Sequence, residues 1–321
     1  MKDLIIGDLH IGSKLYPPEA ILKRLRRHIE EVNPDRVFFL GDLFDSSLPD
    51  PRWVYQFLRA ISDVEWYAID GNHDIHSGLL RSALMVFGYN YGELRVVDNY
   101  GLVPWSYVLK EGITSSEDFW KKIVSNDVRV VLTHFALKPY PKSELLAGRE
   151  LVLDCRKDVY VIAGHIHEGM LFDNCEHTGS FVPVKINELA FKRWSVVMED
   201  GKPASRILVS WPYFVVNGSL EEILEKIDLL TLEDEYAVLV IESSDRNVLS
   251  YKFEIPDTWT IRVNYMPAED KRASISITKV ADSVHLLGVD DVVSMLIEKD
   301  DSGISKERLK NAWYEIKNFE A

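Results

Sequence analysis

The sequence predicts a layered α/β fold with its site at the carboxyl ends of the strands. Apolar runs typical of buried strands alternate with segments of helical periodicity from the N-terminus onwards. Five of these runs end directly in Asp, Asn or His, and the run at 66–69 leads into the motif Gly71-Asn72-His73-Asp74. Open α/β sheets bind their ligands at such strand ends, so we expect the five ends to meet at one site.

The other four runs deliver candidate ligands of the same kinds. Asp8 and His10 follow the run at 4–7, Asp42 follows the run at 37–41, His134 follows the run at 130–133, and His165 and His167 follow the run at 159–164. Glycines at positions 7, 41, 71 and 164 lie at these junctions. We expect them to permit the close backbone approach that a metal centre requires.

Apolar periodicity places helices between the strands, at 21–32, 51–61, 77–87 and 115–124. The surplus of apolar side chains on the second and third helices fits either core packing or a dimer face. The basic cluster Lys23, Arg24, Arg26 and Arg27 is either a solvated helix face or a phosphate contact. Further strands are expected at 95–105, 175–180, 193–199 and 205–209, with a tight turn at Asp200-Gly201.

The chain changes character near Trp211-Pro212. A helix at 220–230 and strands at 236–242, 258–263 and 274–278 predict a smaller α+β domain that carries no cluster of ligand residues. Helices at 290–299 and 305–318 follow, and this tail either closes the small domain or docks a partner. The predicted organisation is therefore a main domain at 1–210, a cap at 211–282 and a helical tail at 283–321.

Composition narrows the setting of the protein. The 321 residues include two cysteines, Cys155 and Cys175, too few and wrongly spaced for a disulfide framework or a thiolate metal site. No apolar run approaches a membrane span and no signal peptide is evident, so a reducing cytoplasm is expected. The net charge of -14 argues against a basic nucleic-acid surface, although bound cations would reverse the local field where a phosphate sits.

The candidate ligands outnumber what one ion needs. Seven side chains offer oxygen or nitrogen and none offers sulfur: Asp8, His10, Asp42, Asn72, His134, His165 and His167. A single divalent ion takes about four to six ligands, so the set predicts two ions, with Asp42 as the natural bridging carboxylate. Imidazole, carboxylate and carbonyl ligands together favour manganese, iron or zinc over magnesium.

Two such ions predict phosphoester hydrolysis, because they polarise a phosphate and bring the pKa of a water towards neutrality. His73, next to Asn72, is the candidate for the leaving group, either as a proton donor or by stabilising charge. Asp45 and Asp74 are placed to orient His73 or a ligand histidine. For Asp74, a carboxylate that caps the turn is the other interpretation.

The set Asp8-Leu9-His10, Gly41 to Asp45, Gly71 to Asp74, Thr133-His134 and Gly164 to His167 resembles the calcineurin-like metallophosphoesterase superfamily in full complement and order. Within it, Pro104-Trp105 and Thr178-Gly179-Ser180 make the chain most similar to the SbcD branch of double-strand-break repair nucleases, related to the meiotic-recombination-eleven nuclease. The motifs cover about the first two hundred residues. The resemblance implies a two-sheet sandwich flanked by helices, with the cap and tail added.

The resemblance also implies roles. One metal would be held by Asp8, His10, Asp42 and His167, and the other by Asp42, Asn72, His134 and His165, with His73 and Asp45 at the catalytic centre. It implies manganese-dependent exonuclease and endonuclease activity on DNA, a homodimer built from the helices after the second and third motifs, and an SMC-like ATPase partner at the tail. Asp45 and His177-Thr178 depart from the meiotic branch, which leaves the branch and the strand preference open.

Two alternatives remain open. A phosphatase or a cyclic-nucleotide phosphodiesterase could use the same scaffold, and the acidic charge mildly favours this. A metal-free scaffold that serves only as an interaction surface would be recognised by a lost ligand, and all seven ligand positions are filled.

Overall fold

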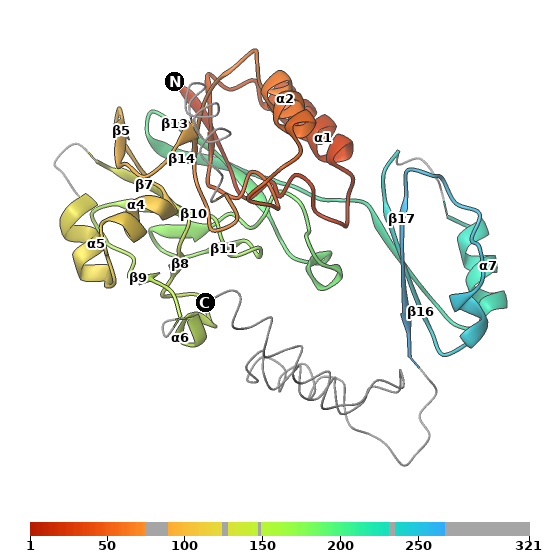
Figure 1. The fold of residues 1–321 in the computed structure, drawn as a ribbon. Helices are drawn as coiled ribbons and strands as arrows, with labels where there is room; N and C mark the ends of the chain where they lie inside the picture. The colour runs from red at the N-terminus through yellow and green to blue at the C-terminus, as the bar shows by residue number, and fades with distance from the viewer. Residues whose placement is uncertain (75–88, 124–127, 147–148, 231–234, 267–321) are drawn as a thin grey trace, which may run out of the picture. The chain divides into compact units, whose positions relative to one another are not determined.

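The computed structural model describes residues 1–74, 89–123, 128–146, 149–230 and 235–266. Two six-stranded sheets pack face to face between two layers of helices (Figure 1). The first sheet has the order β14-β13-β1-β2-β3-β4 and the second the order β11-β12-β10-β7-β6-β5. The predicted α/β class and the two-sheet sandwich are therefore confirmed.

The elements follow the predicted order closely. The helices are α1 (Pro18–Val32), α2 (Pro51–Ala60), α4 (Trp105–Lys110), α5 (Ser116–Ile123), α6 (Ser143–Leu146) and α7 (Leu220–Asp228). The first sheet contains β1 (Lys2–Ile6), β2 (Arg36–Phe39), β3 (Glu65–Ile69), β4 (Tyr89–Asn90), β13 (Trp194–Glu199) and β14 (Lys202–Leu208). The second contains β5 (Arg95–Val97), β6 (Tyr100–Val103), β7 (Val130–Thr133), β10 (Tyr160–Ala163), β11 (Met170–Leu171) and β12 (Cys175–His177). The short strands β8 (Ala136–Leu137) and β9 (Val152–Leu153) pair with each other.

Alternate residues of the central strands enter different cores. Ile5 and Phe38 lie between the two sheets, whereas Leu4 and Phe39 face the layer of α1 and α2. This alternation follows from the two-residue repeat of a strand, and burial on both faces explains why the runs read as continuously apolar. Strands β1, β2 and β3 are parallel, as are β7 and β10, so in each sheet their carboxyl ends share an edge.

A third, three-stranded parallel sheet lies at the end of the described chain. It contains β15 (Tyr213–Asn217), β16 (Val238–Ser243) and β17 (Thr260–Tyr265), and α7 packs on it through Ile223 and Ile227. Strand β15 was not predicted, because a five-residue strand directly after Trp211-Pro212 reads as a linker. The helix α4 was also missed, since six residues after Pro104 are too short to show a period.

Several predictions concern residues outside the described ranges. These are the helix at 77–87, the strand at 274–278 and the tail helices at 290–299 and 305–318. Of the apolar residues on α2, Phe57 is fully buried in the core whereas Tyr55 is 61% exposed. Among the described residues, no helix is both long and apolar enough to cross a bilayer.

The basic cluster on α1 forms ion pairs across the protein surface. Arg26 pairs with Glu30 and Arg27 with Glu31, each one helical turn away, and Lys23 pairs with Glu235. Exposed pairs of this type add little stability, but they satisfy the cations. The contacts agree with a solvated helix face.

The two cysteines are joined, which the sequence did not predict. Cys155 follows β9 and Cys175 opens β12, and a disulfide links them across a Cα–Cα distance of 6.1 Å. The expectation of unlinked cysteines in a reducing setting is corrected on this point. A pair of cysteines without a characteristic spacing gives no sequence signal, because the two residues are 20 apart in the sequence and meet only in the folded chain.

Candidate metal centre

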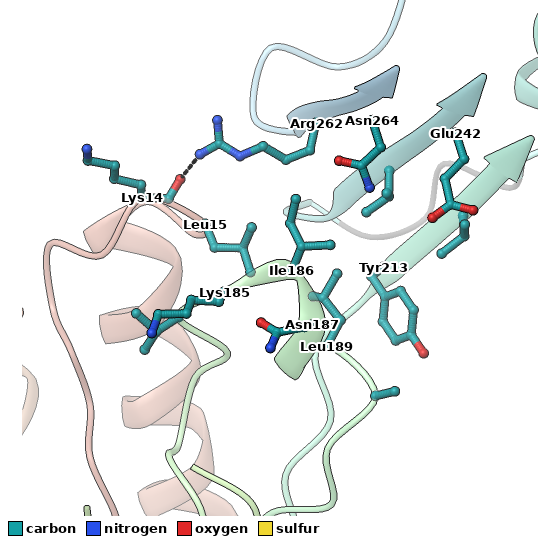
Figure 2. Close-up of a pocket in the computed structure, with 14 residues that line it drawn as sticks. Lys14, Leu15, Lys185, Ile186, Asn187, Leu189, Tyr213, Glu242, Arg262 and Asn264 are labelled. Atoms are coloured by element: carbon teal, nitrogen blue, oxygen red, sulfur yellow. Dashed lines mark hydrogen bonds between the residues drawn. The ribbon is translucent and has the colours of Figure 1, made fainter. Parts of the chain in front are cut away.

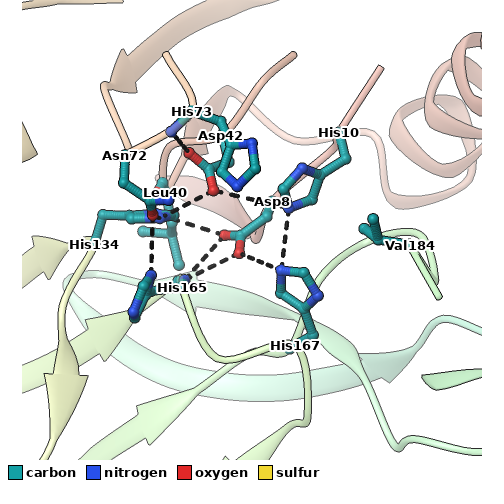
Figure 3. Close-up of polar contacts among 12 residues, drawn as sticks. Asp8, His10, Leu40, Asp42, Asn72, His73, His134, His165, His167 and Val184 are labelled. Atoms are coloured by element: carbon teal, nitrogen blue, oxygen red, sulfur yellow. Dashed lines mark hydrogen bonds and ion pairs between the residues drawn. The ribbon is translucent and has the colours of Figure 1, made fainter. Parts of the chain in front are cut away.

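Five strands deliver the seven candidate ligands to one place, where the carboxyl edges of the two sheets meet (Figure 3). The loop after β1 carries Asp8 and His10, the loop after β2 carries Asp42, and the loop after β3 carries Asn72. From the second sheet, β7 leads to His134 and β10 to His165 and His167. One contact between the two sheets is the His165 backbone N–H, which donates to Asp8 Oδ2 at 3.0 Å.

The loops are crowded, as the glycines predicted. A Cβ on Gly71 would lie 2.2 Å from Asp42 Oδ1, and one on Gly164 would lie 2.4 Å from Asp8 Oδ1. Gly41 has a φ of +101°, and its Cβ would lie 2.6 Å from His134 Nδ1. No side chain can be added there without displacing a candidate ligand, which confirms the predicted role of these glycines.

Three candidate ligands have positive φ angles although none is glycine. These angles are 42° at His10, 46° at Asp42 and 72° at His165. L-residues rarely adopt this region, and residues held there tend to cluster at functional sites. At the site, these conformations occur at the loop tips that carry the candidate ligands.

The first group of ligand atoms surrounds His167. His10 Nε2 lies 3.1 Å from His167 Nε2, and Asp8 Oδ2 lies 3.8 Å from that same atom. Asp8, His10 and His167 each offer a ligand atom within 4.8 Å of the others. This grouping matches three of the four ligands that the resemblance assigns to one metal.

The second group surrounds Asn72. Its Oδ1 lies 3.1 Å from His134 Nε2 and 3.0 Å from His165 Nδ1. Asp42 Oδ2 lies 3.3 Å from His134 Nε2 and 3.8 Å from His10 Nε2, so one carboxylate oxygen faces both groups. Asp42 thus occupies the position expected of a bridge.

The hydrogen bonds behind the histidines fix which nitrogen carries a proton. His10 Nδ1 faces Asp45 Oδ1 at 3.1 Å, and His134 Nδ1 faces the Leu40 carbonyl at 2.7 Å. These oxygens can only accept, so each Nδ1 donates and each Nε2 is left with a lone pair. That lone pair points at other acceptors, which is unfavourable unless a cation or a proton lies between them.

The donor set therefore fits divalent cations. Two ligand atoms bound about 2.1 Å from one ion at right angles are about 3 Å apart, close to the spacings found here. The carboxylates of Asp8 and Asp42 are 0% and 2% exposed, and buried charges of one sign require compensation. Imidazole nitrogen with carboxylate and amide oxygen suits manganese, iron or zinc.

The pKa shifts of the buried side chains also favour a cation at this site. Burial raises the pKa of the Asp8 carboxyl above its usual range. Burial would also raise the pKa of Asp42, but His134 and His10 outweigh it and hold that pKa far below its usual range. Burial disfavours charge on His134, yet Asp42 and Asp8 raise the pKa of His134 to about 10. The two carboxylates therefore favour positive charge at His134, as they would favour a bound cation.

His73 stands at the mouth of the centre. Its backbone N–H donates to Asp42 Oδ1 at 2.9 Å, and its exposed ring meets the His10 ring edge-to-face at 5.1 Å between centroids. His73 Nδ1 lies 3.5 Å from the Asp45 carbonyl, while the Asp45 carboxylate contacts His10. The Asp45 side chain is therefore placed to orient a candidate ligand.

Asp74 braces the backbone beneath the ligands. Its fully buried carboxylate accepts from the N–H groups of Gly71, Leu43 and Phe44 at 3.1 to 3.3 Å. These bonds join the loop of Asp42 to the loop of Asn72. They correspond to the turn-capping interpretation of Asp74.

Sequence reasoning missed two carboxylates and one histidine next to the centre. Glu150 and Glu188 contact His165 and His167. His177, 0% exposed, accepts from the Leu137 N–H and faces the Gly164 carbonyl, and burial lowers the pKa of His177 to about 3. No spacing rule relates these residues to the ligands, so the sequence held no signal that could have found them.

A cavity of about 810 Å³ lies beside the centre, between the 3-10 turn η1 (Ile186–Glu188) and the strands β15–β17 (Figure 2). Lys14, Lys185 and Arg262 line it together with apolar side chains. None of the seven candidate ligands does so. The chemistry of the ligands, not the size of the cavity, therefore locates the candidate site.

Comparison with known proteins gives consistent matches. Residues 1–169 match the family described as calcineurin-like phosphoesterase. The DNA double-strand break repair protein Mre11 of Archaeoglobus fulgidus is 27% identical over 211 residues, covering 54% of this chain and 47% of that protein. Mre11 of Methanococcus maripaludis is 26% identical over 207 residues, covering 53% of each. The SbcD component of the nuclease SbcCD of Staphylococcus epidermidis is 21% identical over 241 residues, covering 59% and 63%. The chain spans less than two thirds of the length of each relative.

Proposed function

Because the chain belongs to the calcineurin-like phosphoesterase family, we propose that its metal centre hydrolyses the phosphodiester bonds of DNA. The resemblance drawn from the motifs is confirmed at the level of this family and of its SbcD-like and Mre11-like relatives. The observation that carries the proposal is the convergence of histidine lone pairs on buried carboxylate and amide oxygens. Such a cluster is suited to holding two cations.

The proposed ligands divide as the contacts suggest. Asp8, His10 and His167 with Asp42 would hold one ion, and Asn72, His134 and His165 with Asp42 the other. When bound, two such ions supply Lewis-acid polarisation of a phosphate and lower the pKa of water. His73, exposed beside the shared Asp42, would donate a proton to the leaving oxygen or stabilise its charge. Asp45 would keep the His10 ring in its binding orientation.

The finer parts of the proposal rest on the relatives. Two of them are named for double-strand break repair and one as part of a nuclease. We extend to this chain an exonuclease and endonuclease activity with manganese, action on DNA in repair and recombination, a homodimer and an SMC-like ATPase partner. In the proposed organisation, residues 1–210 carry the chemistry, 211–282 cap the DNA and 283–321 dock the partner.

The second candidate is a phosphatase or a small-molecule phosphodiesterase on the same scaffold. The net charge of -14 favours it, since a polyanion is repelled by an acidic surface away from the metals. The two functions separate by substrate. Labelled duplex DNA, single-stranded DNA and a small phosphodiester should be compared with the manganese-loaded protein. Turnover of the small ester while both DNAs stay intact would overturn the nuclease.

Neighbouring variants test the mechanism. His73→Ala removes no proposed ligand, so it should keep two manganese ions and DNA binding while cleavage falls about a hundred-fold or more. Asn72→Ala is the matched contrast, because it should lose metal as well as cleavage. Metal analysis and a DNA-binding assay would accompany the rate measurements. Wild-type cleavage by His73→Ala would show that another group serves the leaving oxygen, and a wild-type protein without metal would indicate a scaffold.

A further inference from the structure

Two carboxylates lie behind the centre, each against a different candidate ligand. Glu150 Oε1 and Oε2 lie 3.1 and 3.0 Å from His165 Nε2. Glu188 Oε2 lies 3.1 Å from His167 Nδ1. In both rings the nitrogen that meets the glutamate is the one that faces away from the other ligands. Neither glutamate has a place in the catalytic mechanism set out above.

We propose that Glu150 positions His165 for one metal ion and Glu188 positions His167 for the other. This inference rests on the metal centre of the proposed function but not on its substrate. Each glutamate is a positioning residue that acts through its histidine. The two ions should therefore respond to different glutamates.

The physical reason lies in the tautomer. A carboxylate can only accept, so His165 Nε2 and His167 Nδ1 must carry the protons. The opposite nitrogens then hold lone pairs, His165 Nδ1 towards Asn72 Oδ1 at 3.0 Å and His167 Nε2 towards His10 Nε2 at 3.1 Å. A carboxylate partner also raises the basicity of an imidazole that binds a metal.

Burial makes these contacts effective. The Glu150 side chain is 16% exposed and the Glu188 side chain 7%, so water screens both hydrogen bonds little. The two glutamates come from separate segments, one just before β9 and the other at the end of η1. A change in one segment need not disturb the other.

The two glutamates differ in the other hydrogen bonds that they make. Glu188 Oε2 also accepts from the Val184 N–H at 2.8 Å, and the Glu188 carbonyl accepts from Arg193 Nη2 at 2.6 Å. Glu188 thus also fixes its own loop. The contacts of the Glu150 carboxylate are with His165. Glu150 is therefore the cleaner test of positioning.

The test is manganese binding to the full chain without DNA, by calorimetric titration and electron paramagnetic resonance. Glu150→Ala should weaken one of two manganese sites about ten- to a hundred-fold and leave the other unchanged. The spectrum should change from that of a coupled pair to that of an isolated ion. Asp154→Ala is the matched control, because this carboxylate of the same segment pairs with Lys138. The Asp154→Ala protein should bind two manganese ions as wild type does.

Further variants separate positioning from a merely structural role. Glu150→Gln keeps the size and an accepting oxygen but removes the charge, so positioning predicts weakened binding whereas a steric role predicts wild-type affinity. Adding Glu150→Ala to His165→Ala should cause no further loss, because both affect the same ion. Adding Glu150→Ala to His167→Ala should weaken both sites. Conversely, Glu188→Ala should cause no further loss when added to His167→Ala, and should weaken both sites when added to His165→Ala.

Wild-type affinities and a wild-type spectrum in Glu150→Ala would overturn the proposal, as would full additivity with His165→Ala. A wild-type protein that binds two manganese ions but leaves DNA intact would instead overturn the nuclease function alone. Thermal unfolding of the metal-free variants separates a folding defect from lost affinity. If Glu188→Ala unfolds, Glu188→Gln supplies the second arm.

Discussion

His177 should make the stability of the protein depend on pH in a calculable way. The side chain is 0% exposed, its Nδ1 donates to the Gly164 carbonyl and its Nε2 accepts from the Leu137 N–H, each at 3.1 Å. A proton on Nε2 would face that N–H. Burial, the largest cause, accordingly lowers the pKa of His177 to about 3.

The direction of the pH dependence follows from which state of the chain, folded or unfolded, binds more protons. An unfolded histidine has a pKa of about 6.5, so between pH 6.5 and 3 the unfolded chain binds more protons than the folded one. The contribution of His177 to stability is therefore present above pH 6.5 and is lost as the pH falls. The loss should be about 2 kcal/mol at pH 5 relative to pH 7.5, and about 4 kcal/mol at pH 3.

The assay is urea unfolding with a chelator at pH 7.5, 6 and 5, comparing wild type with His177→Gln. Glutamine keeps a donor and an acceptor but does not titrate, so the other titrating groups cancel between the two proteins. The free energy of unfolding of wild type should fall about 2 kcal/mol more than that of the variant between pH 7.5 and 5. Parallel pH profiles would refute the reasoning and show that His177 titrates normally when folded.

Three further predictions concern the frame of the centre, each read from urea unfolding with a chelator. His10→Gly should be about 1 kcal/mol more stable than His10→Ala, because φ is +42° there. At Asp8, where φ is not positive, the alanine variant should be the more stable of the two, which provides the control. Asp74→Ala should lose about 3 kcal/mol by leaving three buried N–H groups without their acceptor; an unchanged midpoint would contradict this. Replacing Cys155 and Cys175 by serine opens a loop with a sequence separation of 20 and should cost about 3 kcal/mol, which wild type in reductant should reproduce.

The grouping of the candidate ligands could be predicted from the sequence because each of them follows its strand within a few residues. Parallel strands bring their carboxyl ends to one edge, so Asp8, Asp42 and Asn72 had to meet once the first sheet formed. The glycines gave independent support, since the close approach at Gly71 and Gly164 is a backbone property that a sequence displays. The sequence pattern and the topology of the parallel strands therefore predict the same site.

Partners from distant segments could not be read in this way. Glu150 and Glu188 reach His165 and His167 from irregular segments, whose positions depend on the packing of the whole sandwich. An isolated glutamate in a loop is usually exposed to solvent. The Cys155–Cys175 link and strand β15 were missed for the same reason, because neither has a local period or spacing.

The positive φ angles at three candidate ligands carry a conformational cost that other contacts must offset. His10, Asp42 and His165 each adopt a conformation that costs about 1 kcal/mol or more, and their lone pairs and charges face one another besides. Main-chain hydrogen bonds between the loops offset this cost: the N–H groups of Leu9 and His10 both donate to the Asp42 carbonyl, at 3.1 and 2.9 Å. Main-chain contacts of the fold therefore hold the candidate ligands close together. Affinity for a cation should depend on ring tautomer and charge, which the carboxylates behind the rings would control.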